Sequence, residues 1–214
     1  MQLDRNFAKA DHSELIENII RFYKNNMADR VFPDWYNYAF DDCSYISELG
    51  LIMYGVKTEV WQVAAIVAIL SPANKWATNK QDALNVISEI ADDQKDIAYF
   101  TYGNNVAKAR EMTKYDLDKD SQFICEKYLK TPKILNFFWS ILDSQAAFCV
   151  DRHMLTVAGI NSGKEFPTKA QYNAIQKVFL TVWEKLNKPF GSPAKFQAQL
   201  WQATVFTKNG INHY

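Results

Sequence analysis

The feature that most limits how this chain can fold is the segment from Thr58 to Ser71, which reads TEVWQVAAIVAILS. Its apolar side chains fall on every face of a helix, and a helix that is apolar all round has to be enclosed by other elements. Thr58 is a suitable N-cap, and Pro72 follows the expected end at Ser71. The pattern predicts a buried helix over 58–71 at the centre of the fold.

The rest of the chain also shows helical periodicity, with start and stop signals at each segment. Helices are expected to begin at residues 11–14, to run from 33 to 55 and from about 77 to 91, to begin at 132 and at 152, and to run from 169 to 186 and from 194 to 206. The 214 residues include only 7 Gly and 6 Pro, and no strand longer than a few residues is predicted. We therefore expect an all-α fold of about ten helices in two lobes, with residues 1–214 as one domain.

Two polar segments in the middle of the chain are harder to assign. Lys108 and Arg110 are interpreted as the basic start of a helix, and the acidic segment Asp116–Asp120 as a solvated turn. Neither pattern specifies a function by itself.

Composition narrows the classes of partner and cofactor. The 24 Lys and Arg balance the 24 Asp and Glu, so any contact with DNA has to come from a local patch. Cys43, Cys125 and Cys149 lack the spacing of metal ligands, so we expect no metal site and no cofactor. The N-terminus is polar and no apolar run reaches transmembrane length, which predicts a cytoplasmic monomer without a membrane partner.

The stretch from Thr131 to His153 holds the residues of greatest chemical interest. Thr131 is a good N-cap and Pro132 suits the first helical position, which places Lys133 in the first turn. A cation there faces the positive end of the helix dipole, so its charged form is disfavoured and the neutral amine can act as a nucleophile. Asp151 stands 18 positions later, where it can cap a second helix and serve as a base or stabilise a cation. The alternative is a solvated lysine and a purely structural cap.

This stretch resembles the core of the helix-hairpin-helix DNA glycosylase superfamily, in its endonuclease III-like group. Those proteins carry a glycine-rich hairpin that ends in a catalytic lysine at a helix start. A Val-Asp-Thr-His element with a catalytic Asp follows about 18 residues later. Lys133 matches the lysine, Val150–His153 matches the second element, and Gly159 stands where the family often has a glycine. The Gly-x-Gly of the hairpin is absent, since the chain reads Leu129–Pro132 there.

The resemblance extends over residues 60–206. Leu70-Ser71 and Asn79-Lys80 match the end of a buried helix and the start of the next one, and Asn105–Ala109, which contains Lys108, matches an Asn-x-x-Lys-Ala element. The likeness is closer to phage and bacterial proteins of unassigned function with a Leu-Ser-Pro, Trp, Asn pattern, represented here by Ser71, Trp76 and Asn79. Many relatives hold a four-cysteine iron–sulfur cluster near the C-terminus, and this chain has no cysteine after Cys149.

The resemblance implies a DNA base-processing enzyme that flips a base and attacks the N-glycosidic bond, with or without a lyase step. Lys133 and Asp151 would be catalytic. The residues expected to contact DNA or the flipped base are Ser71, Asn74, Trp76, Asn79, Lys108 and Arg152. Trp76 also fits a core position, Arg152 also fits a surface charge, and His153 is expected to support the site structurally.

Two other functions fit the same pattern. One is a phage enzyme that transfers an amine or amino acid onto phosphorylated 5-hydroxymethyluracil in DNA, which would act in the host cytoplasm. The other is a helical module that binds DNA or protein without chemistry, which the neutral net charge suits.

Overall fold

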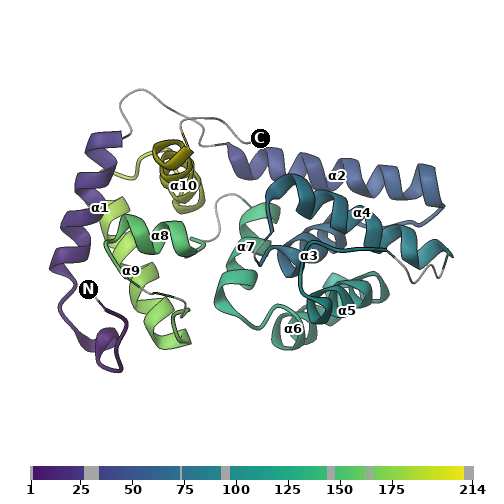
Figure 1. Cartoon of the computed structure of the whole chain (residues 1–214), viewed down its shortest axis with the longest axis horizontal. Coiled ribbons are helices and arrows are strands. Elements are labelled where there is room, and N and C mark those ends of the chain that lie inside the picture. Colours follow the sequence, from purple (N-terminus) through teal and green to yellow (C-terminus); the bar gives the residue numbers. More distant parts are fainter. Residues whose placement is uncertain are drawn as a thin grey trace. The chain divides into compact units, whose positions relative to one another are not determined.

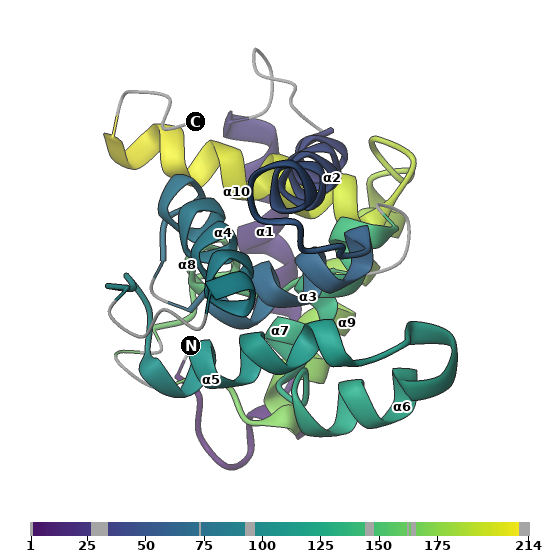
Figure 2. The same ribbon diagram turned by 90° about the vertical axis from the view of Figure 1, so that its right-hand side faces the viewer.

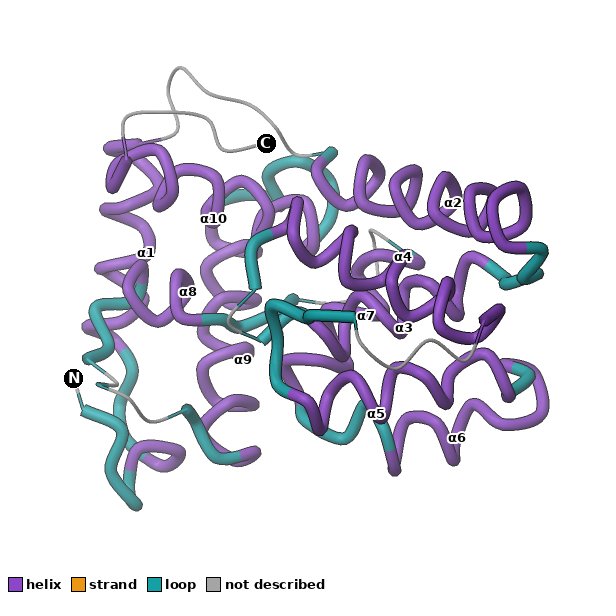
Figure 3. The backbone as a smooth tube through the Cα atoms, turned by 45° about the vertical axis from the view of Figure 1, so that its right-hand side comes forward, coloured by secondary structure: helices purple, strands orange, loops and turns teal. Residues whose placement is uncertain are grey.

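A computed structural model describes residues 2–26, 34–72, 74–92, 97–143, 148–161, 163 and 166–209 of the chain. These residues form α-helices and two short 3₁₀ helices without a β-strand, which confirms the predicted all-α class (Figure 1, Figure 3). The elements are η1 (Phe7–Lys9), α1 (Ser13–Asn26), α2 (Trp35–Tyr54), α3 (Val60–Leu70), α4 (Trp76–Asp92), α5 (Gly103–Glu111), η2 (Met112–Lys114), α6 (Leu117–Lys127), α7 (Pro132–Leu142), α8 (Arg152–Val157), α9 (Lys169–Lys185) and α10 (Pro193–Asn209).

The helices belong to two compact units. Unit 1 combines both ends of the chain, Met1–Tyr36 and Asp143–His213, and unit 2 is the middle segment Asn37–Leu142. Unit 1 therefore contains α1 and α8–α10, and unit 2 contains α3–α7 and nearly all of α2. The two units are described separately below.

Helix α3 forms the centre of unit 2, as its sequence predicts. Every residue from Trp61 to Leu70 is buried, and α3 contacts α4, α5 and α7 (Figure 2). The N-cap is Glu59, whose backbone N–H donates to Gln62 Oε1 at 2.8 Å, so the expectation that Thr58 caps this helix is wrong. Thr58 is instead tied to α2, because its hydroxyl lies 3.2 Å from Ser47 Oγ.

Unit 1 is built around a core that α1, α8, α9, α10 and η1 share. Within this core, the rings of Phe148 and Phe179 stack with their centroids 4.7 Å apart. The predicted capping box of Thr168 and Gln171 at the start of α9 is present, and Ser192 Oγ accepts from the Lys195 N–H at the start of α10 at 3.2 Å. Both starts follow from their local sequences.

Two expectations about the middle of the chain are wrong. The segment from Asp116 to Asp120 is the beginning of α6, because the Asp116 carboxylate accepts from the Asp118 N–H at 3.0 Å and caps the helix. Lys108 and Arg110 lie in the last turn of α5, which begins at Gly103. Cations in a last turn face the negative end of the helix dipole, which is a favourable position.

Pro33, the expected start of the second helix, lies outside the described residues, and α2 is described from Trp35.

Two further features are absent from the residues that the structure describes. No helix there combines the length and the apolar character that crossing a bilayer requires. No cluster of three or more His, Cys, Asp or Glu side chains there is placed to hold a metal ion.

Candidate functional site

Lys133 is the second residue of α7 in unit 2. The Leu135 N–H donates to the Thr131 carbonyl at 3.0 Å, which makes Thr131 the residue that opens the helix and Pro132 its first position, as predicted. The Lys133 side chain is half-buried. It therefore extends from a helix N-terminus, where the dipole opposes a cation.

The connection between α6 and α7 replaces the glycine hairpin that the family resemblance implies. Tyr128 and Leu129 are buried, and the Leu129 N–H donates to the Ile124 carbonyl at 3.1 Å. Lys130 and Thr131 then turn outward to solvent. The chain thus shapes this connection with buried side chains rather than with glycines, and it exposes a lysine three residues before Lys133.

Trp76, at the start of α4, reaches α7 close to Lys133. Its ring meets the ring of Phe137 edge-on, with centroids 6.4 Å apart. Phe137 follows Lys133 by four residues, so the two share one face of α7, one helical turn apart. The indole N–H donates to Asp42 Oδ2 at 2.8 Å, and Lys80 Nζ lies 3.0 Å from both oxygens of Asp42. Trp76 is therefore held in a fixed orientation and half-exposed beside α7.

Asn74 is held by a buried carboxylate that the sequence reasoning missed. Asp82 is 0 % exposed, and its Oδ2 accepts from Asn74 Nδ2 at 2.8 Å and from the Phe100 N–H at 3.2 Å. Asn74 Oδ1 in turn accepts from the Thr78 hydroxyl. Asp82 precedes Ala83 on the buried side of α4, and an acid within such an apolar face is the signal that would have found it. The Asp82 carboxylate thus joins the loop before α4 to the segment before α5.

Ser71 and Asn79 turn their side chains to the backbone of α3. Ser71 Oγ donates to the Ala68 carbonyl at 2.9 Å, and Asn79 Nδ2 donates to the Val67 carbonyl at 3.0 Å. Asn79 is only 2 % exposed. The Asn79 side chain therefore joins α4 to α3, and the contact with a base expected for it stays a prediction.

Two exposed aromatic side chains near this loop were also missed. Phe100 and Tyr102, in the segment before α5, are 67 % and 63 % exposed. Two contacts hold this segment: the Phe100 N–H donates to the Asp82 carboxylate on α4, and the Thr101 hydroxyl lies 3.5 Å from the Pro72 carbonyl. Lys108 follows in α5 and is half-buried. Phe100 and Tyr102 are two of several exposed large apolar side chains of unit 2, and their alternation with Thr101 in the sequence is the signal that could have indicated them.

Arg110, which the sequence grouped with Lys108, is used within unit 2. Its Nε donates to Glu89 Oε2 at 2.6 Å, and the pKa of Arg110 is raised, chiefly by this hydrogen bond. The guanidinium carbon lies 5.9 Å from the Tyr99 ring centroid. Burial, and then the neighbouring Glu89, raise the pKa of Tyr99 well above its ordinary value. Arg110 and Glu89 therefore form an ion pair beside the Tyr99 ring, and Arg110 and Tyr99 both keep their protons near neutral pH.

Asp151 is the N-cap of α8 in unit 1, as predicted. Its Oδ1 accepts from the Met154 N–H at 3.0 Å, and the preceding Val150 N–H donates to the Tyr172 hydroxyl at 2.8 Å. The carboxylate is half-buried, and one of its two oxygens makes the cap. Asp151 is thus held by the hydrogen bond of its carboxylate to Met154 and by that of the preceding residue to Tyr172.

Arg152 and His153 leave α8 in different directions. Arg152 is exposed, with its guanidinium carbon 5.7 Å from the centroid of the Phe166 ring. His153 Nδ1 lies 3.0 Å from Thr204 Oγ1, and its ring meets Trp201 edge-on at 5.9 Å. His153 therefore joins α8 to α10, in agreement with the supporting role expected for it.

The thiols are poor candidates for nucleophiles. Burial, with a smaller contribution from Asp42, raises the pKa of Cys43 to about 12. Burial also raises the pKa of Cys125. Both side chains are therefore protonated near neutral pH, and a thiol is far less nucleophilic than its thiolate.

The two candidate catalytic residues lie in different units, Lys133 in unit 2 and Asp151 in unit 1. Each unit is described internally, so the expectation that both side chains face one cleft stays a prediction. Within unit 2, Trp76 meets Phe137, which lies one turn after Lys133 on α7, and Asn74 precedes Trp76 by two residues.

A protein-family model, described as "Family of unknown function (DUF7178)", matches residues 1–209. The chain belongs to this family. The match spans both units, so DUF7178 describes the whole two-unit fold and includes every candidate residue above. No curated protein and no solved structure matches the chain.

Proposed function

We propose that this member of DUF7178 is an enzyme that processes bases in DNA, with Lys133 and Asp151 as its reactive groups. The observation that carries the proposal is the surroundings of Lys133: a half-buried lysine at a helix N-terminus, one turn before Phe137, whose ring meets the Trp76 ring that Asp42 holds in place. A DNA glycosylase-like reaction needs such a combination, an amine for chemistry and an aromatic face for an extruded base.

The proposed reaction breaks the bond between a base and its sugar. The transition state carries positive charge on the sugar, which a carboxylate beside C1′ stabilises, and Asp151 is the proposed carboxylate. The hydrogen bond from the Met154 N–H orients the Asp151 carboxylate before substrate binds. A charge that is already oriented stabilises a transition state most effectively. Lys133 either attacks C1′ and forms a Schiff base after the base departs, or orients the substrate.

The proposed DNA contacts are local and suit a chain whose net charge is zero. Phe100 and Tyr102 offer ring faces on which unpaired bases stack. Lys108, Lys130 and Arg152 are the cations proposed to contact phosphates, at positions that are exposed or half-buried. Trp76 and Asn74 are proposed to lie beside the reacting nucleotide.

Mass spectrometry of nucleosides tests the proposal directly. DNA from phage and bacterial sources, including DNA that contains 5-hydroxymethyluracil, is incubated with the wild-type chain and with Lys133→Ala, and the nucleosides and free bases are then measured. Lys57→Ala is the matched control, since it removes an exposed lysine from the same unit. We expect conversion by the wild type and the control, and loss of conversion in Lys133→Ala.

The product separates the possible reactions. Free base in solution indicates a glycosylase, and a heavier nucleoside retained in the DNA indicates the transfer of an amine or amino acid. Borohydride added during the reaction traps a Lys133 adduct if the amine attacks C1′. Binding of DNA without any change in nucleosides on every substrate would contradict the enzymatic proposal and favour a binding module.

A further inference from the structure

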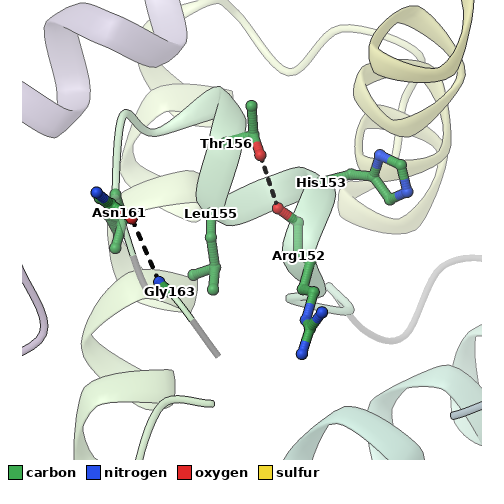
Figure 4. A pocket seen from close by; sticks show the side chains of 7 residues that line it. Arg152, His153, Leu155, Thr156, Asn161 and Gly163 are labelled. Atoms are coloured by element: carbon green, nitrogen blue, oxygen red, sulfur yellow. Dashed lines mark hydrogen bonds between the residues drawn. The ribbon is translucent and has the colours of Figure 1, made fainter. Parts of the chain in front are cut away.

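A pocket of about 370 Å³ lies beside α8 in unit 1, and the proposed chemistry does not use it. Arg152 stands on one side, Asn161 and Gly163 stand on the other, and Leu155 points between them (Figure 4). The volume is at the lower end of the range of small-molecule sites. An isolated phosphate ion would fill only a small part of it, so a matching ligand has an organic body.

The lining chemistry favours an anion. Leu155 and Ile160 form an apolar base, Thr156 and Asn161 are neutral polar residues, and the described residues that line the pocket include no Asp or Glu. His153 also lines the pocket, but its Nδ1 is directed to Thr204 on α10. Arg152 is therefore the permanent positive charge among the described residues that line the pocket.

Arg152 is prepared for an oxyanion. Its guanidinium lies over the Phe166 ring, which restricts the orientations of the side chain. Among the residues that the structure describes, no ion pair includes Arg152. A planar guanidinium with paired N–H donors matches the geometry of phosphate and carboxylate groups.

Asn161 completes the polar side of the pocket. Its Oδ1 accepts from the Gly163 N–H at 3.3 Å, so the acceptor end of the amide is already used (Figure 4). No described residue accepts from the amide nitrogen, whose two N–H donors can face a ligand. Arg152 and Asn161 thus place donors on opposite sides of an apolar base.

We propose that this pocket binds a small organic molecule through its phosphate or carboxylate group, with Arg152 and the Asn161 amide as the oxyanion contacts. The proposal shares Arg152 with the proposed function but does not depend on Lys133 chemistry, so either can fail alone. Thymidine 5′-monophosphate and glutamate represent the two sources of the oxyanion.

Titration calorimetry on the full chain tests the proposal, with thymidine as the probe that lacks an oxyanion. We expect thymidine 5′-monophosphate or glutamate to bind with one site, and thymidine to bind at least about tenfold more weakly. Arg152→Gln should weaken the bound probe by at least about tenfold, since a hydrogen bond to a charged group is lost. Arg21→Gln, which removes an exposed arginine from α1 of the same unit, should leave it unchanged.

Asn161→Asp is the sharper variant. The new carboxylate can still accept from the Gly163 N–H, so the local fold is retained, but it adds a negative charge to the pocket. We expect this variant to lose oxyanion binding while its thermal unfolding stays close to that of the wild type. Unweakened binding to both Arg152→Gln and Asn161→Asp would overturn the proposal, as would no binding of either oxyanion probe.

A single-stranded oligonucleotide, titrated in parallel, separates a DNA phosphate from a free ligand. If Arg152→Gln weakens only the oligonucleotide, the arginine contacts the DNA backbone and the small-molecule proposal is wrong. If it weakens the small probe as well, the pocket is a ligand site in its own right.

Discussion

Replacement of Asp82 by Ala should loosen the loop that carries Asn74 and Trp76. Asp82 is fully buried, and its carboxylate accepts from Asn74 Nδ2 at 2.8 Å and from the Phe100 N–H at 3.2 Å. Alanine removes both acceptor oxygens and leaves two donors in a largely enclosed site. The loop before α4 and the segment before α5 then lose their common anchor.

The magnitude follows from the two lost hydrogen bonds. A hydrogen bond to a charged group contributes about 1.5–3 kcal/mol, and removal of the buried charge offsets part of the loss. We expect the free energy of unfolding to fall by about 2–4 kcal/mol, which for a chain of this size lowers Tm by about 5–15 °C. Asp82→Asn keeps one acceptor oxygen but places an NH₂ group opposite one of the two donors, so its loss of stability should be intermediate.

Urea and thermal unfolding, read by circular dichroism, measure the loss. Asp41→Ala is the control, because Asp41 is an exposed acid of the same unit, and its change should stay within about 0.5 kcal/mol. Hydrogen exchange of the Phe100 N–H should accelerate in Asp82→Ala. A stability within about 0.5 kcal/mol of the wild type, together with unchanged exchange at Phe100, would refute the anchoring role of Asp82.

Two further predictions concern the backbone and the response to pH. Gly159→Ala should cost about 2–3 kcal/mol, because Gly159 has a φ of 73° and a Cβ would lie 2.6 Å from Asn18 Nδ2. Gly191→Ala, with a φ of 78° and open space, should lose only about 1–2 kcal/mol in urea unfolding. The Tyr128 hydrogen bond raises the pKa of Tyr115 to about 12, so its stabilisation is complete below the ordinary pKa of about 10 and disappears as pH rises to about 12. In Tyr128→Phe, NMR of the tyrosine ring carbons should show the pKa of Tyr115 lowered from about 12 toward its ordinary value.

Local sequence predicts most of the fold because the helices here carry local signals. The segment over 58–71 is apolar on all faces and forms the buried centre of unit 2. Asp151, Thr168 and Ser192 are predicted and observed caps, since capping depends on residues only two or three positions apart. The segment 116–120 was misassigned because acidic residues suit both a turn and the first turn of a helix.

The candidate site is less predictable because it depends on contacts between distant segments. Asp82 and Phe100 are 18 positions apart, and no local pattern pairs them. Asn79 is a polar residue of the kind found in binding sites, but it is buried and its amide donates to a backbone carbonyl of α3. Lys133 and Asp151 stand at the predicted helix starts, although the chain assigns them to different units. Sequence spacing predicts the position of each residue along its helix, and it does not predict which unit holds it.

The central claim is that the Asp151 carboxylate takes part in chemistry on DNA and does more than cap α8. The most direct measurement is the single-turnover rate of Asp151→Asn on a DNA substrate that the wild type converts. Asparagine caps almost as well as aspartate, so the variant should remain within about 1 kcal/mol of wild-type stability. We expect the rate to fall by about two to four powers of ten, as for other positioned acid–base groups. A wild-type rate in a folded Asp151→Asn variant would contradict the account and leave Asp151 as a helix cap.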